Sequence, residues 1–338
     1  MTPSLGRRSR SHGPLGLFAH HREHEPHHLV ILVLLAGAIS LAATIAAAWI
    51  AGFGAVADAA RHVNFYWVPF AMAGVVAAQF GYVFAYREIA HVDRGARIGA
   101  LRAGAVVAAG FGMFFPRGGF AVDLEALEDL GVPRAEARVR VLGLGSLEYA
   151  VLAAGACTCA ALMLLSGDHT ARAVTWSWVI GVPAGTCLAI LAVARRDWLC
   201  RGPARFIRPF LDALFIVGLI VAAPRRHGLK AFTGMALYWA GEIFVLWVCL
   251  AAFTRHLPSI PAVVVGYATG YALTRRTLPL AGAGAVELLL PIALYWVGFP
   301  LAASVLAVLA YRVFNLWLPI VPATAGVIAL RRRPLDSS

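Results

Sequence analysis

The chain has 338 residues, of which 60% are apolar and only 14% are charged. Soluble globular domains carry about a quarter charged residues, so this composition excludes an ordinary soluble enzyme. The net charge of +12 comes from 29 basic and 17 acidic residues, and all but one of the basic residues are arginine. In a membrane protein such a surplus is typical of cytoplasmic loops that follow the positive-inside rule, and it does not indicate a nucleic-acid partner.

The first 28 residues form a polar segment rich in arginine and histidine, which includes the run Arg7-Arg8-Ser9-Arg10. This composition is typical of disorder, and we expect a cytoplasmic tail that touches anionic headgroups. The apolar run at 29–53 is too long for the core of a cleavable signal peptide. The five cysteines lie in or beside apolar stretches without a Cys-x-x-Cys pair. We expect them to be packing residues, and we expect neither a metal site nor a cofactor.

Apolar windows of about 20 residues, the length that crosses a hydrocarbon core, recur along the rest of the chain and predict an all-α polytopic integral membrane protein with roughly 8–10 membrane segments. The expected segments cover residues 29–53, 63–86, 101–115, 141–166, 173–194, 210–223, 231–253, 260–274, 287–298 and 301–328. Those that begin at Leu101, Phe210 and Glu287 are too short to span. Short apolar segments are often re-entrant or broken helices, so we expect functional residues beside them.

Arginine clusters predict the orientation. They lie at 7–22, 87–102, 134–140, 195–208 and 331–333, and the positive-inside rule places all of them, and therefore both termini, in the cytoplasm of a cell whose plasma membrane holds the protein. The segment 210–223 is basic at both ends. It either crosses the membrane or dips in and returns, and the charge pattern leaves both alternatives open.

Two helix faces carry small residues at a spacing of four, Gly181 with Gly185 and Gly266 with Gly270. In lipid, helices associate by close approach over small residues. We therefore expect both faces to be helix-packing surfaces.

A break rich in proline and glycine occurs twice, each time followed by Ala-Val and a carboxylate. The first consists of Pro116, Arg117, Gly118 and Gly119 and leads to Asp123, and the second consists of Pro279, Gly282 and Gly284 and leads to Glu287. Each is followed by a Gly-x-Pro sequence, at Gly131 and at Gly298, that opens a long apolar helix. We predict an internal duplication, with a first repeat at 29–194, a basic loop at 195–208, a second repeat at 209–330 and a cytoplasmic tail at 331–338.

Each break interrupts a helix and leaves backbone N–H and C=O groups free. A half-helix that starts after the break points the positive end of its dipole toward it, and transporters built from repeats place their substrate sites at such discontinuities. The alternative is that proline and glycine only make tight connections here.

Five ionisable residues lie inside apolar segments, where insertion scales assign each charge a cost of at least about 2.5 kcal/mol. They are Glu148, Asp212, Glu242, Glu287 and Arg312. Such groups must be paired, face a cavity or be neutral. Arg312 is a plausible partner of Glu287. Asp212 and Glu242 are weaker candidates because either could lie near an interface, and the whole set could instead be structural ion pairs that fix helix packing.

The second break, together with Tyr311-Arg312 and Trp317-Leu318-Pro319, resembles the flippase-like membrane region of the lysylphosphatidylglycerol synthase transmembrane family. The resemblance covers residues 29–330. The chain departs from the family pattern at Phe120 and Tyr149, where the family has an acidic residue and an arginine. The resemblance implies a translocase for charged lipids or lipid-linked sugars without the soluble synthase domain.

The leading hypothesis is therefore a membrane flippase, not an enzyme, that serves a partner glycosyltransferase or aminoacyl-transferase and moves an anionic or phosphate-bearing lipid. Its expected substrate path comprises Pro116, Arg117, Gly118, Gly119, Asp123, Glu148, Pro279, Gly282, Gly284, Glu287, Tyr311 and Arg312. One alternative is a membrane enzyme acting on a polyprenyl-phosphate-linked lipid, which would use the acids at Asp123, Glu125, Glu128 and Asp129. We interpret those acids as the solvated face of an amphipathic helix, opposite Leu124, Leu127 and Leu130. Another alternative is a non-transporting accessory protein or scaffold.

Overall fold

The computed structural model describes residues 26–61, 63–92, 97–112, 119–167, 171–200, 206–222, 228–271 and 279–332, and the regular structure in these ranges is entirely helical. Six described helical stretches are long and apolar enough to cross a membrane. They are α2 (Pro26–Ala51), α4 (Val68–His91), α7 (Arg134–Leu165), α8 (Arg172–Ala194), α11 (Gly228–Phe253) and the stretch formed by α14 (Leu301–Arg312) and α15 (Ile320–Arg332). The protein is thus an all-α polytopic membrane protein, as predicted.

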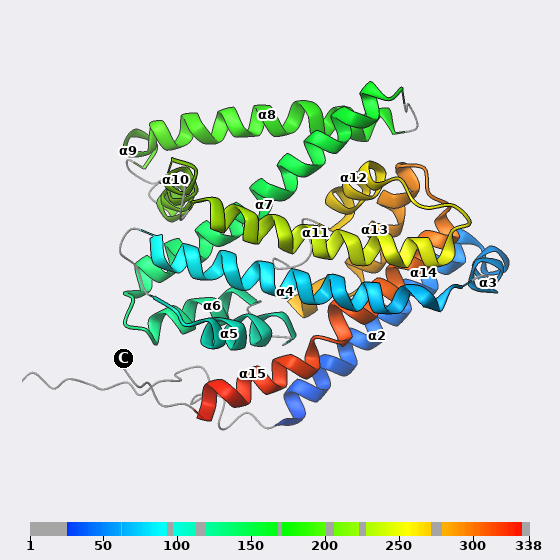
Figure 1. Cartoon of the computed structure of the whole chain (residues 1–338), viewed down its shortest axis with the longest axis horizontal. Helices are drawn as coiled ribbons and strands as arrows, with labels where there is room; N and C mark the ends of the chain where they lie inside the picture. The colour runs from blue at the N-terminus through cyan, green and yellow to red at the C-terminus, as the bar shows by residue number, and fades with distance from the viewer. Residues whose placement is uncertain are drawn as a thin grey trace, which may run out of the picture.

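Four of the described helices that are too short to cross a membrane are neighbours in sequence. They form two pairs, α5 (Ala100–Gly112) with α6 (Gly119–Glu128), and α12 (Ile260–Tyr271) with α13 (Ala285–Trp296). Figure 1 shows the first pair toward one end of the bundle and the second pair toward the other end. The short segments expected at Leu101 and Glu287 are present, and α12 is a further one.

The order of elements repeats along the chain. A long helix, two short helices, a Gly-x-Pro turn and a second long helix form α4 to α7, and the same order forms α11 to α15. In both turns the glycine is left-handed, with φ of +80° at Gly131 and +101° at Gly298, a conformation that ends a helix at little cost for glycine. Leu301 and Arg332 lie 167 residues after Arg134 and Leu165, so the second long helices match in length.

The two units are inverted relative to each other. Gly74 of α4 faces Gly241 of α11, and Gly81 faces Gly234, so the residue numbers rise along one helix as they fall along the other. Figure 1 shows the same arrangement, with α4 and α11 side by side and running in opposite directions. The second long helix of each unit also packs against the other unit, since α7 contacts α12 and α15 contacts α5.

The contact between α4 and α11 brings the two backbones together. A Cβ atom on Gly81 would lie 2.4 Å from the backbone nitrogen of Tyr238, and one on Gly241 would lie 2.6 Å from the carbonyl oxygen of Gly74. No side chain fits at these distances, so glycine is required here. In lipid, where apolar surfaces gain little by meeting each other, such close approach supplies the van der Waals contact that holds helices together.

Only one of the two expected packing faces is confirmed. Gly266 and Gly270 of α12 lie against Leu294 and Leu290 of α13. A methyl group added at Gly181 or Gly185 of α8 would meet no described atom within 4 Å, so the prediction for α8 is wrong. That helix packs mainly against α7 and leaves most of its apolar surface exposed.

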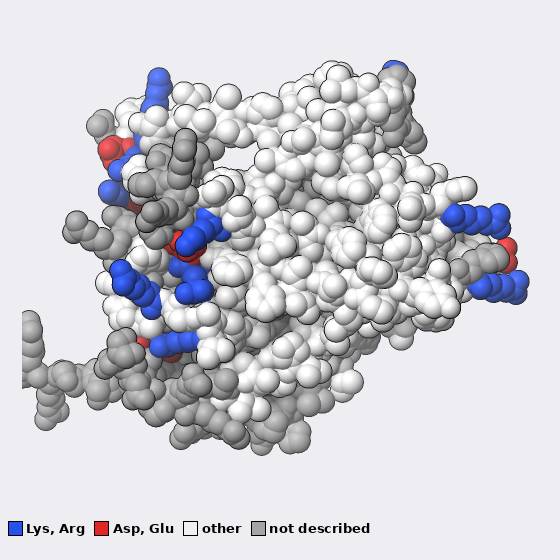
Figure 2. All heavy atoms as spheres, in the orientation of Figure 1, with Lys and Arg blue, Asp and Glu red and all other residues white. Residues whose placement is uncertain are grey.

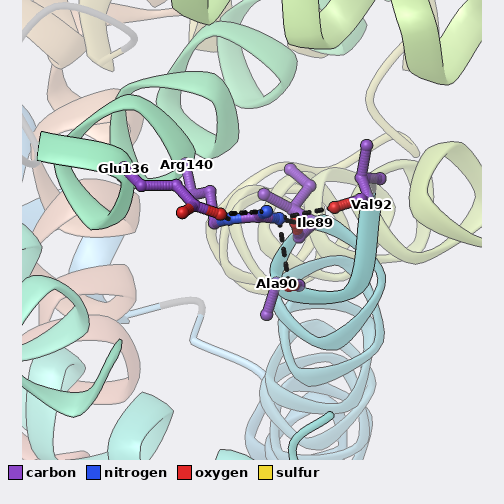
Figure 3. Close-up of polar contacts among 5 residues, drawn as sticks. All are labelled: Ile89, Ala90, Val92, Glu136 and Arg140. Atoms are coloured by element: carbon purple, nitrogen blue, oxygen red, sulfur yellow. Dashed lines mark hydrogen bonds and ion pairs between the residues drawn. The ribbon is translucent and has the colours of Figure 1, made fainter. Parts of the chain in front are cut away.

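Arg140 joins the start of α7 to the end of α4 (Figure 3). Its Nη1 donates to the carbonyl oxygens of Ile89, Ala90 and Val92 at 3.1, 3.0 and 2.7 Å. Its Nη2 donates to Oε1 of Glu136 at 2.6 Å. The carbonyls at the end of a helix lack partners and carry the negative end of the helix dipole, so a buried guanidinium satisfies both requirements at once.

Charged residues gather at the two ends of the bundle and leave a broad uncharged band between them (Figure 2). The larger group lies at the end where α4 finishes and α7 and α11 begin. At the other end Arg61 of α3 (Phe53–Arg61) forms a 3.3 Å ion pair with Asp58. This separation is the pattern expected of a chain that spans a membrane.

The first described residue of α2 and the last described residue of α15 lie toward the same end of the bundle (Figure 1). The helix α10 (Arg208–Ala222) packs against α7 and is seen nearly end-on in that view, beside α9 (Arg196–Leu199). It lies across the basic end and does not run the length of the bundle. With 15 residues α10 is shorter than the helices that are long enough to cross a membrane.

We predict that Gly81→Ala lowers the stability of the detergent-solubilised protein by at least about 1–3 kcal/mol, because the added methyl overlaps backbone atoms that cannot yield. The matched control is Gly155→Ala in α7, where nothing lies within 4 Å of the new Cβ. That change should stabilise the helix by up to about 1 kcal/mol. Thermal unfolding followed by tryptophan fluorescence measures both, and equal melting temperatures would contradict the proposed backbone contact.

We also predict that Arg140→Met destabilises the protein by about 2 kcal/mol or more, since it leaves the carbonyls at the end of α4 without a donor. Arg138→Met is the control, because Arg138 lies two residues away on an exposed face of the same helix. Hydrogen exchange should show faster opening of the last turn of α4 in the first variant only.

Candidate functional site

The first buried polar group surrounds Glu287 and ties three helices together. Nε of Arg312, on α14, donates to Oε1 of Glu287 at 2.7 Å, and both side chains are only 2% exposed. Ser40 of α2 donates to the same oxygen through its hydroxyl group. The backbone N–H of Gly284 donates to Oε2 at 2.7 Å. The expected pairing of Glu287 with Arg312 is confirmed.

The local sequence explains how Glu287 reaches this position. The second break is a true interruption of helical backbone, because Leu280, Gly282 and Gly284 all have positive φ, of +56°, +69° and +86°. The turn at Pro279–Gly282 directly precedes α13. Glu287 therefore lies in the first turn of a new helix, where a carboxylate can accept from a free N–H and meets the positive end of the dipole.

The hydrogen-bond acceptors of the Glu287 carboxylate are satisfied within the protein. Both oxygens of Glu287 accept hydrogen bonds from the protein, and no described side chain beyond Ser40 and Arg312 is needed to satisfy them. A buried pair of this kind is costly to break from one side. The geometry fits the alternative in which Glu287 and Arg312 fix the packing of α2, α13 and α14.

The second buried polar group surrounds Glu242 in the middle of α11. The hydroxyl of Tyr311 donates to Oε2 of Glu242 at 2.6 Å, and Nδ2 of Asn315 donates to the same oxygen. The hydroxyls of Tyr311 and Tyr267 lie 3.2 Å apart. Glu242 is 5% exposed, so its carboxylate depends on these protein groups rather than on bulk water.

Asn315 reaches Glu242 from an irregular part of the backbone. Residues Val313–Trp317 form a short π-helix between α14 and α15, closed by a bond from Leu318 N–H to Val313 O at 2.9 Å. Wide turns of this type are rare in helices and are frequent at functional sites. The extra residue in the turn separates α14 from α15.

The Glu242 group borders a narrow recess at the contact between the two units. Its wall comes from α4 of the first unit and from α11 and the α14–α15 stretch of the second, through Val75, Gln79, Glu242, Val245, Tyr311, Phe314, Asn315 and Pro319. Four of these side chains carry polar atoms. The other four are apolar, so the lining of the recess is mixed.

A row of aromatic rings runs from the first unit to this group. Tyr82 of α4 packs on Tyr238 at 5.2 Å between ring centroids, Tyr238 on Trp239 at 4.7 Å, Trp239 on Tyr267 at 5.8 Å and Tyr267 on Tyr311 at 6.1 Å. Offset and edge-to-face contacts of this kind hold rings rigidly. The row fixes the position of the Tyr311 hydroxyl against Glu242.

Glu148 of α7 belongs to the same region. It is buried, its backbone oxygen accepts a hydrogen bond from Nε1 of Trp239 at 2.6 Å, and it interacts electrostatically with Glu242. Arg312 is also near enough to attract Glu242. The predicted residues Glu148, Tyr311 and Arg312 are thus brought together around a residue that the predicted path omitted.

Other predicted residues lie elsewhere. Pro116, Arg117 and Gly118 lie outside the described residues, and Gly119 is the first residue of α6. Asp212 is partly exposed and lies 3.9 Å from both Arg196 and Arg208 at the basic end, so it does not belong to either buried group.

The sequence predicted that all the acids of α6 lie on a solvated face of an amphipathic helix. The structure differs at one of them. Asp123 is fully buried together with Leu127, one turn further on, and its backbone oxygen accepts a 3.3 Å hydrogen bond from the hydroxyl of Tyr86. Asp123 is buried by tertiary packing, because both α5 and α7 contact α6. Asp123 and Leu127 therefore share one face, and the predicted separation of acids from leucines is wrong at this position.

The omission of Glu242 has an identifiable reason. A single carboxylate in the 26-residue apolar helix Gly228–Phe253 is a strong signal in itself. The prediction set it aside as a residue near an interface, whereas the structure places it in the core. Asn315 and Tyr267 carry no such signal, since each is an ordinary polar residue within an apolar run.

No family model and no curated protein matches the chain. The class of the protein therefore follows from its own architecture: a helical, multi-pass membrane protein with two inverted units and buried ionisable groups where they meet.

We predict that Arg312→Met alone lowers the stability by about 3–5 kcal/mol, because it leaves the Glu287 carboxylate buried without its cation. Combining it with Glu287→Gln should recover most of that loss. Chemical unfolding of the two single variants and the double variant gives the coupling energy. A double variant as unstable as the sum of the single variants would contradict the pairing.

Proposed function

We propose that this membrane protein is a translocase that carries an anionic or phosphate-bearing lipid, or a lipid-linked sugar, from one leaflet to the other. The observation that supports the proposal most strongly is the inverted pair of units with buried polar groups at their contact. Transporters with inverted repeats place substrate and coupling-ion sites near the middle of the membrane, between the repeats and beside broken helices. Two features support this comparison: the Glu242 group lies where α4 of the first unit meets α11 of the second, and Glu287 follows the second break.

The proposed path runs between the two breaks. The short pairs α5–α6 and α12–α13 lie toward opposite ends of the bundle (Figure 1), so in this proposal each pair serves one side of the membrane. Arginine binds phosphate in bidentate fashion, which gives Arg117 of the first break a role in holding a headgroup. The resemblance to the lysylphosphatidylglycerol synthase transmembrane family supports a lipid as the cargo.

The proposed orientation places the larger charged group of Figure 2 in the cytoplasm. Described basic residues at the helix ends of that side include Arg87, Arg102, Arg138, Arg208 and Lys230. Under the positive-inside rule these residues remain on the cytoplasmic side of the plasma membrane, and the proposal assigns both chain termini to that side.

A non-transporting accessory role is the second candidate. It is favoured by the buried ion pair of Glu287 with Arg312, in which both carboxylate oxygens already accept hydrogen bonds from the protein. In that case the buried charges only fix helix packing. Their replacement would then change the amount of protein in the membrane without changing any lipid flux per molecule.

We predict that proteoliposomes containing the wild-type chain bring fluorescent phosphatidylglycerol to the outer leaflet faster than empty liposomes do. Glu242→Gln should slow this movement about tenfold or more, corresponding to at least about 1.4 kcal/mol in the barrier, at equal protein content. Cys187→Ser on the exposed face of α8 is the control. Accessibility of the label to a membrane-impermeant quencher gives the rate.

A wild-type rate equal to that of empty liposomes, with this lipid and with a polyprenyl-phosphate-linked sugar, would reject the translocase. Conversion of the sugar lipid into a new product would instead indicate the membrane enzyme.

A further inference from the structure

We propose that an anionic phospholipid binds between α8 and the rest of the bundle, with its acyl chains beneath the middle of α8 and its headgroup against the arginines where α8 ends. The site uses none of the residues of the proposed substrate path. It is therefore independent of the translocase, and its evidence is the packing of α8 and the charge at one end of that helix.

Both ends of α8 are attached to the bundle. Near its start Thr175 is fully buried, and Nε1 of Trp178 donates to Oγ1 of Thr269 on α12 at 2.9 Å. Beyond its other end, the guanidinium of Arg196 on α9 lies 4.4 Å from the centroid of the Phe215 ring on α10, a cation–π contact. Since α10 packs against α7, the two ends of α8 are fixed to the same bundle.

Between these attachments α8 stands away from its neighbours. Residues 183–188 are all exposed, although six consecutive residues cover more than one turn and therefore every face of a helix. Gly185 follows Trp178 by seven residues and precedes Arg196 by eleven, which places all three on one face at 3.6 residues per turn. Gly185 thus faces the bundle, yet a methyl group added there would meet no described atom within 4 Å.

The opening beneath α8 is bordered by α7 and α10. Figure 1 shows α7 and α8 diverging from the end where they meet, with α10 between their far ends, and Figure 2 shows open space beneath α8 at this place. Pro183 lacks an N–H and bends helices, which allows α8 to leave α7. On α10, Gly218 is exposed, and a methyl group added there would also meet no described atom within 4 Å.

The opening lies at the depth of acyl chains. Its α8 side carries one hydroxyl group, that of Thr186, which already donates to the carbonyl oxygen of Val182 at 2.8 Å, so water would find few partners there. Arg195 follows Gly185 by ten residues, or about 15 Å along a helix, and half of a hydrocarbon core is also about 15 Å. Trp198 of α9 is 63% exposed, as is typical of a tryptophan at the headgroup level.

The charges at the end of α8 favour an anionic headgroup. Three arginines, Arg195, Arg196 and Arg208, lie here with two acids, Asp197 and Asp212. The distances from Arg196 and Arg208 to Asp212 are 3.9 Å, too long for hydrogen bonds. The side chain of Arg208 is 65% exposed and Arg195 is exposed as well. Guanidinium groups bind phosphate in bidentate fashion, so a lipid without a compensating positive charge fits this end best.

Native mass spectrometry of the purified full chain tests the charge preference. The chain is titrated in detergent with phosphatidylglycerol or with phosphatidylcholine. We expect the wild type to retain one phosphatidylglycerol per chain and to bind it at least about tenfold more tightly than phosphatidylcholine. Combining Arg196→Gln with Arg208→Gln should remove this preference. Arg172→Gln, which removes an exposed arginine at the other end of α8, should keep it.

A second pair of variants tests the opening itself. Gly185→Trp fills the space beneath α8 and should weaken binding of phosphatidylglycerol by about tenfold or more. Ile190→Trp is the matched control, because Ile190 is 63% exposed and lies five residues further on, nearly opposite Gly185 on the helix. It should bind the lipid as the wild type does. If Gly185→Trp does not fold, as judged by gel filtration, Gly185→Leu makes the same test with a smaller side chain.

Equal binding of phosphatidylglycerol by Gly185→Trp and Ile190→Trp, or equal wild-type affinity for the two lipids, would overturn the inference. A wild-type dimer that Gly185→Trp converts to a monomer would show that a second copy of the chain occupies the opening, and would also overturn it. An absence of lipid movement in proteoliposomes rejects the translocase alone and leaves the lipid site in place.

Discussion

The contact between α4 and α11 is the constraint on which the rest of the structure depends. Where Gly74 meets Gly241 and Gly81 meets Gly234, the two backbones approach so closely that a methyl group would overlap the facing chain. Lipid provides no hydrophobic force to bring helices together, so a contact of this kind must supply the attraction by itself. It places one helix of each unit at the centre and thereby brings Gln79 and Tyr82 beside Tyr238 and Glu242.

Two buried carboxylates, Glu287 and Glu242, are held by different kinds of partner. Glu287 begins a helix, accepts from a backbone N–H and is paired with Arg312, so its charge is neutralised by fixed groups. Glu242 lies in the middle of an unbroken helix and accepts from two neutral donors, Tyr311 and Asn315. Neutral donors stabilise a charge less than a cation does. The first arrangement suits a permanent structural tie between α2, α13 and α14, and the second joins α11 to α14 and the π-helix.

Inversion gives the two ends of the bundle equivalent helices. Each unit contains a long helix, a broken pair and a second long helix, and each second long helix finishes against the first short helix of the other unit. Movement of either unit therefore displaces an element that contacts the other. The two units differ in one respect. The helix α7 is continuous, whereas the corresponding α14–α15 stretch is divided by the π-helix at Val313–Trp317.

The sequence by itself determined the class of the protein, the short broken segments, the repeated order and the pairing of Glu287 with Arg312. These follow from length, apolar composition, glycine and proline positions and the high cost of charge in lipid, which are local properties. It did not reveal that the units are inverted, that glycines of α4 and α11 form the central contact, or that Asp123 is buried and Gly181 exposed. Nor did it place Glu242, Tyr267 and Asn315 in one group. Those features depend on which helix face meets which neighbour, and in a chain that is apolar on nearly every face only the tertiary packing decides that.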